Sequence, residues 1–156
     1  MTWVVYYSRT GNTQKVAREI AQKIDCEKLK LIDKKDRSGI SGFLTGGWEA
    51  WREKTTDIFL ENRVELTRDN FIIGTPVWAN KPTPAVRTFV LQNKDKFEEV
   101  SFYCTHGGSG GKETFQQLEK ICEKEPKSTL DIDDDEIDRK ILETKIEEFL
   151  SEIGDN

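Results

Sequence analysis

The sequence has few of the residues on which disulfide-linked and zinc-binding proteins depend. It contains three cysteines and a single histidine in 156 residues. Cys26, Cys104 and Cys122 are odd in number and lack Cys-x-x-Cys spacing, so neither a disulfide framework nor a zinc site is predicted. Cys104 stands in an apolar run, where a small, buried core residue is expected.

Long hydrophobic runs are also missing. No apolar stretch approaches the roughly 20 residues that span a bilayer, and the first residues do not have the pattern of a signal peptide. The net charge is −5 and no basic stripe stands out, which argues against a nucleic-acid-binding surface. We therefore expect a cytoplasmic protein that binds neither membranes nor nucleic acid.

What the sequence does have is an alternation of strand and helix patterns, and its length predicts one domain over residues 1–156. Short apolar runs at 3–7, 71–73 and 100–104 predict central parallel strands covered on both faces. Alternating patterns at 29–31 and 129–132 predict edge strands. Amphipathic helices between the strands then imply a parallel sheet wound on both faces.

Two helix starts carry recognisable signals. Thr83 followed by Pro84 predicts an N-cap with proline at the first helical position. Asp133, Asp134 and Asp135 precede the last helix and can be taken for an ion site, but capping is the favoured interpretation. Their spacing is not that of a calcium loop, and no metal site is predicted.

Residues 37–51 are less regular, with four glycines among hydrophobic residues. Leu44, Trp48 and Trp51 would share one face of a helix, which favours a crossover helix whose aromatic side chains pack on the sheet. The alternative is a surface segment that meets a cofactor or a partner.

The segment directly after the first strand predicts a phosphate site. A helix N-terminus offers unpaired backbone N–H groups and the positive end of the helix dipole, and the hydroxyls of this segment add donors. It lacks the Gly-Lys-Ser/Thr ending of a magnesium–triphosphate loop, so a phosphate monoester that stays bound is the better fit. The segment is Ser8, Arg9, Thr10, Gly11, Asn12 and Thr13.

Two further segments follow apolar strands, at 74–82 and 105–111. Alone, the first can be a turn imposed by prolines and the second a flexible glycine linker. Beside a phosphate loop they favour a planar ligand, because Trp78 can stack on a ring and the glycines let the backbone approach its edge. His106, the only histidine, can exchange a proton near neutral pH, but no acid or nucleophile stands next to it.

The motifs Ser-x-Thr-Gly-Asn-Thr, Gly-Thr-Pro-Val-Trp and Thr-His-Gly-Gly-Ser-Gly, in this order, resemble the cofactor loops of the flavodoxin family. The resemblance covers most of the chain. It implies an α/β fold with a five-stranded parallel sheet in the order 2-1-3-4-5, helices on both faces, and FMN bound at the switch point of the strand order. The implied cofactor-binding residues are Ser8, Arg9, Thr10, Gly11, Asn12, Thr13, Thr75, Pro76, Val77, Trp78, Ala79, Thr105, His106, Gly107, Gly108, Ser109 and Gly110.

The same resemblance implies an electron carrier that meets redox partner proteins transiently, with no catalytic residue of its own. The alternative is an FMN-dependent reductase that uses NAD(P)H and a quinone or flavin, and a third is a flavin-free binding module. Two departures from the family bear on the choice. The loop at 105–111 has no second aromatic residue to cover the flavin, and Ala79 stands where glycine eases a peptide flip that favours one-electron chemistry.

Overall fold

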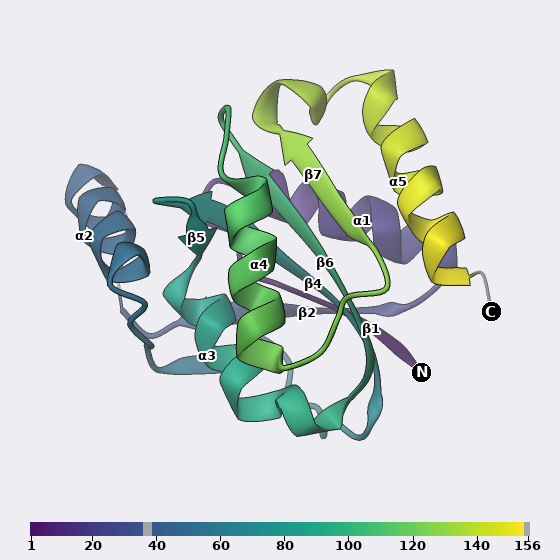
Figure 1. Cartoon of the computed structure of the whole chain (residues 1–156), viewed down its shortest axis with the longest axis horizontal. Helices are drawn as coiled ribbons and strands as arrows, with labels where there is room; N and C mark the ends of the chain where they lie inside the picture. Colours follow the sequence, from purple (N-terminus) through teal and green to yellow (C-terminus); the bar gives the residue numbers. More distant parts are fainter. Residues whose placement is uncertain (36–38, 155–156) are drawn as a thin grey trace.

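The computed structural model describes residues 1–35 and 39–154, in which strands and helices alternate (Figure 1). Short 3-10 helices are labelled η. In chain order the elements are β1 (Thr2–Tyr6), α1 (Asn12–Ile24), β2 (Glu27–Asp33), α2 (Gly39–Trp51), β3 (Ile58–Leu60), β4 (Asp69–Trp78), β5 (Lys81–Pro82), α3 (Pro84–Asn93), η1 (Lys94–Lys96), β6 (Phe97–His106), α4 (Gly111–Cys122), β7 (Thr129–Asp133), η2 (Asp134–Glu136) and α5 (Lys140–Gly154).

The strands form one sheet in the order β3-β2-β1-β4-β6-β7, with β5 paired to the end of β4. Strands β2, β1, β4, β6 and β7 run parallel, which confirms the expected 2-1-3-4-5 order. The expected number of five strands was too low, because β3 and β5 add antiparallel pairs to β2 and β4. Strand β2 was predicted to be an edge strand, and this was wrong because β3 lies outside it. Strand β7 is an edge strand, as predicted.

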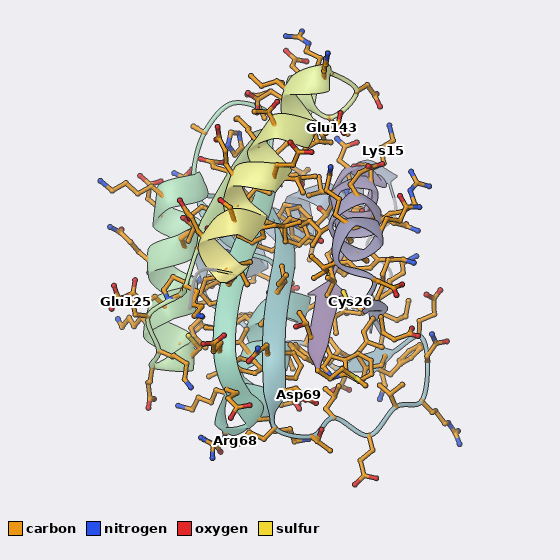
Figure 2. All side chains as sticks on the ribbon, turned by 90° about the vertical axis from the view of Figure 1, so that its right-hand side faces the viewer. Lys15, Cys26, Arg68, Asp69, Glu125 and Glu143 are labelled. Carbon is orange, nitrogen blue, oxygen red and sulfur yellow. The ribbon has the colours of Figure 1, made fainter. Side chains whose placement is uncertain are left out.

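Both faces of the sheet are covered by helices, as the alternation predicted. Along β1, Trp3 and Val5 join a buried cluster with α3 and α4, while Val4 and Tyr6 join a second cluster with α1 and α5. Helices α1 and α5 lie side by side on their face (Figure 2), where Lys23 Nζ is 2.8 Å from Glu147 Oε1. The sheet is thus the middle of three layers, with a separate apolar core on each side.

Strands β4 and β6 extend into the segments that were expected to be loops. Pairing between them continues to Pro76 and Thr105, and Val77 then pairs with Pro82 of β5. Proline lacks the amide proton but keeps its carbonyl and fits extended backbone, so the prolines limit strand pairing here and do not prevent it. Most of the segment 74–82 is consequently a strand and a hairpin.

The hairpin between β4 and β5 turns at Ala79 and Asn80, whose φ angles are 51° and 59°. Positive φ at both central residues is the geometry of a type I′ turn, whose twist matches that of the flanking strands. Asparagine tolerates this conformation, but alanine is strained in it.

Helix α2 confirms that residues 39–51 are helical, but the predicted packing is wrong for two of its side chains. Leu44 is 65% exposed and Trp48 is 48% exposed. The helix meets the sheet at Gly46, where an added Cβ would lie 2.5 Å from a ring carbon of Trp78. The close approach requires glycine at the contact, which turns Leu44 and Trp48 outward. The side chain of Trp51 lies outside the described part of the chain.

The three aspartates at 133–135 mark a capped helix start, as favoured, but the helix is η2 and not α5: Asp133 is the N-cap, and Asp134 and Asp135 lie in the first turn. Asp133 Oδ1 accepts a hydrogen bond from the Asp135 N–H at 3.0 Å, and Glu136 Oε2 accepts one from the Asp133 N–H at 3.1 Å. Within residues 1–35 and 39–154, no cluster of histidine, cysteine or acidic residues is arranged to hold a metal ion, and no helix is long and apolar enough to cross a membrane.

Gly74 stands at the centre of the sheet, paired with Tyr6 of β1 on one side and Tyr103 of β6 on the other. The Tyr103 ring lies over Gly74, where an added Cβ would be 1.9 Å from its Cζ atom. The ring is fully buried, and its hydroxyl donates to the Thr13 carbonyl in the first turn of α1 at 3.2 Å. Burial raises the pKa of Tyr103, so this phenol is a donor at all ordinary pH values.

We expect Gly74→Ala to destabilise the protein by about 3 kcal/mol or more, because the new methyl group and the Tyr103 ring cannot both fit. Urea denaturation measures the change. Adding Tyr103→Leu to the Gly74→Ala variant removes the clashing atoms and should recover part of the loss. Gly47→Ala, in α2 and with nothing within 4 Å of the added Cβ, is the control and should not destabilise. A Gly74→Ala variant as stable as the wild type would contradict this account.

We expect Ala79→Gly to raise the free energy of unfolding by about 0.5–1 kcal/mol, because glycine relieves the left-handed strain but adds freedom to the unfolded chain. Ala79→Val is the matched opposite, since a β-branched side chain fits positive φ least well. Thermal and urea denaturation of both variants should place them on either side of the wild type. If Ala79→Val were more stable than the wild type and Ala79→Gly less stable, the turn geometry described here would be wrong.

Candidate functional site

The turn from β1 into α1 presents a helix N-terminus at the carboxyl edge of the sheet. Gly11, with φ 103°, occupies the N-cap position, and its N–H donates to Ser8 Oγ at 3.1 Å. No side chain caps this end of the helix as the structure describes it. The first-turn N–H groups, together with the helix dipole, therefore remain available to an anion.

Two threonines link this turn to the end of β6. Thr13 and Thr105 are both buried, and their hydroxyl oxygens lie 2.9 Å apart. One hydroxyl donates to the other, so one of the two protons is left to point elsewhere. Thr10, in contrast, is exposed at the start of the turn.

The β4–β5 hairpin forms a second wall. Thr75 Oγ1 accepts a hydrogen bond from the Thr83 N–H at 3.1 Å, which ties β4 to the N-cap of α3. Trp78 packs edge-on against Tyr7, with ring centroids 5.7 Å apart. Because Trp78 is only 7% exposed, little of its ring is accessible to a ligand in this arrangement.

The glycine loop, residues 107–110, joins β6 to α4 and rests on the hairpin. Gly108 and Gly110 have φ angles of 145° and 100°, a region that L side chains rarely adopt. An added Cβ at Gly110 would lie 2.6 Å from Asn80 Oδ1 and 2.7 Å from Val77 Cγ1. The loop and the hairpin are therefore in direct contact, and both glycines are required by conformation or space.

His106, the last residue of β6, is held by two hydrogen bonds. Its Nδ1 accepts from the Gly108 N–H at 3.0 Å, and its Nε2 lies 2.5 Å from Asp131 Oδ1. Cys104 Sγ is also 3.4 Å from Asp131 Oδ1. Burial, followed by the Asp131 charge, raises the pKa of the Cys104 thiol, so this cysteine is a core residue, as predicted, and not a nucleophile.

These segments enclose a cavity of about 370 Å³ at the carboxyl edge of the parallel strands. It brings together many of the predicted residues. Ser8 and Gly11 support the turn beside it, and Thr75, Ala79, Gly108, Ser109 and Gly110 lie in the segments that flank it. Its lining residues are Arg9, Thr10, Asn12, Thr13, Pro76, Val77, Trp78, Thr105, His106, Gly107 and Asp134.

Two aspartates at the site were not predicted as site residues. Asp134 lines the cavity, and Asp131 binds His106. Both come from β7 or the residue after it, and β7 pairs with β6 so that His106 lies opposite Asp133. The expected strand order already placed these two carboxyl ends side by side, which was the signal available in the sequence.

A larger hollow of about 490 Å³ lies along the second half of α4 and the residues that follow it, and it shares no lining residue with the first cavity. All of its lining residues are charged or polar, so it lacks the hydrophobic and aromatic side chains that usually line a site for a planar ligand. Its lining residues are Gln116, Glu119, Lys120, Glu123, Lys124 and Glu125.

No protein-family model matches the chain, and no curated protein matches it in sequence. Solved structures do resemble it. A flavoprotein from Lactobacillus acidophilus NCFM, solved in complex with FMN, is 24% identical and superposes with a TM-score of 0.69 over 88% of this chain and 96% of its own. A putative flavoprotein from Bacteroides uniformis is 19% identical, with a TM-score of 0.67 over 94% and 97% of the two chains.

The two-electron reduced flavodoxin of Megasphaera elsdenii is more distant, at 17% identity and a TM-score of 0.55, with 94% of this chain and 99% of that chain covered. At such identities a likeness establishes the arrangement of the backbone. Together with the strand order and the two covered faces, it shows that this chain has the flavodoxin-like fold.

Proposed function

We propose that this protein binds FMN in the cavity between β1–α1, the β4–β5 hairpin and the glycine loop, and acts as an electron carrier between partner proteins. The observation that carries the proposal is that an uncapped helix N-terminus, a tryptophan and a glycine loop line one cavity. The FMN complex of the structurally similar Lactobacillus flavoprotein supports this choice of ligand. A cytoplasmic location remains part of the proposal.

The donor set suits the phosphate of FMN. A phosphate monoester needs N–H and O–H donors and some positive charge, which the first turn of α1, Thr10 and Arg9 supply at the cavity wall. A single arginine, without the lysine of a nucleotide-hydrolysing loop, fits a group that is held and not transferred.

The opposite wall suits a ring with polar edges. Pro76, Val77 and Trp78 give the cavity an apolar side, and the backbone of Gly107 can approach a ligand closely. Bound FMN would supply the redox chemistry, since it exchanges one or two electrons, while the residues of this chain bind it and limit its contact with water.

A second candidate is an FMN-dependent reductase that takes electrons from NAD(P)H and passes them to a quinone or flavin. One observation favours it. Besides the imidazole of His106, the cavity lining holds one aromatic ring, that of Trp78, and Trp78 is mostly buried. A flavin held here would keep much of one face uncovered, which leaves space for a second planar substrate.

We expect the double substitution Thr10→Ala and Thr13→Ala to weaken FMN binding by about a hundredfold or more, because hydrogen bonds to a charged group are worth about 1.5–3 kcal/mol each. Quenching of FMN fluorescence measures the dissociation constant. Riboflavin, which lacks the phosphate, should bind more weakly than FMN to the wild type and be much less affected by the substitutions.

Two controls separate phosphate binding from structure. Thr13→Ser keeps the hydroxyl that contacts Thr105 and should retain more FMN affinity than Thr13→Ala. Thr129→Ala, at the exposed start of β7, should change nothing. Undiminished FMN affinity in the double variant would sink the assignment of the phosphate site.

Anaerobic reduction of the FMN complex with dithionite distinguishes carrier from reductase. A carrier should accumulate a half-reduced flavin, visible as a long-wavelength absorbance band midway through the titration. Direct passage to full reduction, with oxidation of NADPH in the presence of a quinone, would favour the reductase instead. Failure to bind FMN at all would leave the flavin-free binding module as the remaining function.

A further inference from the structure

The glycine loop is joined to the end of β6 by the imidazole of His106. The Gly108 N–H donates to Nδ1 at 3.0 Å, and the His106 side chain is 10% exposed. Gly108 and Gly110, on either side of Ser109, both need positive φ. A loop with so much glycine has many accessible conformations, so a bond from its middle to a mostly buried ring restricts it strongly.

This bond fixes the tautomer of the ring. A nitrogen that accepts from an N–H carries no proton, so Nδ1 is bare and the single proton of the neutral imidazole lies on Nε2. Nε2 then donates to Asp131 Oδ1, 2.5 Å away. Asp131 thereby selects the tautomer that Gly108 requires, because a carboxylate accepts hydrogen bonds and does not donate them.

The position of Asp131 is itself restricted. Its carboxylate lies over the first residue of α4, where an added Cβ at Gly111 would be 2.3 Å from Oδ2. The N-terminal end of a helix favours a negative charge. The start of α4 therefore restricts the Asp131 carboxylate, which orients the His106 ring. The ring in turn binds the glycine loop.

The charged and titratable groups around the ring come from five segments of the chain. Asp131 and Asp133 of β7 are the near carboxylates, with Asp133 Oδ2 3.9 Å from Nδ1. Asp134 of η2 and Arg9 of the β1–α1 turn line the same cavity. Cys104 of β6 remains a neutral thiol, since its pKa is raised, and Lys145 of α5 donates to the Asp131 carbonyl at 3.2 Å.

We propose that His106 is a positioning residue: its neutral ring holds the glycine loop in the shape that the ligand meets, and protonation at Nδ1 releases the loop. A protonated ring has a donor at both nitrogens, so it can no longer accept from Gly108, and its new proton faces Asp133. Ligand affinity should then be lower for the protonated ring than for the neutral one. The ligand, FMN, rests on the function proposed above; the release of the loop does not.

The loop can be followed without any ligand, because the sequence contains a single histidine and its imidazole signals are unambiguous. In the ¹⁵N-labelled protein, long-range proton–nitrogen spectra of the neutral imidazole should show the Nε2–H tautomer. The Gly108 amide resonance should then shift on acidification with the same midpoint as the imidazole. A ring in the Nδ1–H tautomer, or a Gly108 amide that ignores the imidazole, overturns the proposal.

Two variants test the effect of His106 on FMN binding. In His106→Asn the amide oxygen stands about where Nδ1 stands, so it can accept from Gly108 but cannot titrate. His106→Ala removes the acceptor. FMN dissociation constants at about pH 8 and about pH 5.5 bracket the range in which histidine titrates. At the higher pH, His106→Asn should bind more tightly than His106→Ala and less tightly than the wild type.

The variants also remove a confounding effect. The FMN phosphate gains a proton near pH 6, which weakens binding in every variant alike. The wild type should lose about tenfold more affinity than His106→Asn between the two pH values, the effect of one hydrogen bond of about 1.4 kcal/mol. Equal losses in both proteins would refute a positioning role. If neither binds FMN, the proposed function fails, and the spectra of the free protein alone decide the role of His106.

Discussion

The architecture of the site depends on the absence of a side chain at Gly74, in the middle of the sheet. Tyr6, Gly74 and Tyr103 are neighbours across three central strands. Because position 74 has no side chain, the Tyr103 ring can lie across β4, and its hydroxyl can bind the first turn of α1. The helix N-terminus that faces the cavity is thus positioned from inside the core. The exposed turn that contains Arg9 and Thr10 contributes possible donors, whereas the contact with Tyr103 fixes the position of the first turn of α1.

The other two walls of the cavity depend on each other in a similar way. Gly110 lets the glycine loop rest against Asn80 and Val77, while Gly46 lets α2 rest against Trp78. In each contact a missing side chain allows backbone to approach a neighbouring segment. Close contacts at Gly46, Gly74 and Gly110 therefore help to set the positions of the segments around the cavity.

Much of this arrangement followed from the sequence. Alternating apolar runs and amphipathic helices predicted the doubly wound sheet, and the three loop motifs predicted which segments meet. Local patterns failed where pairing partners decide the outcome. Residues 74–78 look like a loop but are a strand because β6 and β5 are there to pair with them. The β3 strand is three residues long and forms only against β2. Asp131 belongs to no recognisable motif. Its role comes from the pairing of β7 with β6, which places it beside His106.

The contact between Gly110 and the hairpin sets a condition on how this protein can diverge. A chain that acquires any side chain at position 110 must move Asn80 and Val77 away at the same time, because both lie within van der Waals distance of the new atom. Substitutions in the two segments should therefore appear together among descendants of this sequence, although Gly110 follows Asn80 by 30 positions and Val77 by 33. The glycine loop and the β4–β5 hairpin are therefore expected to change together, and a graft of one onto another scaffold should include the other.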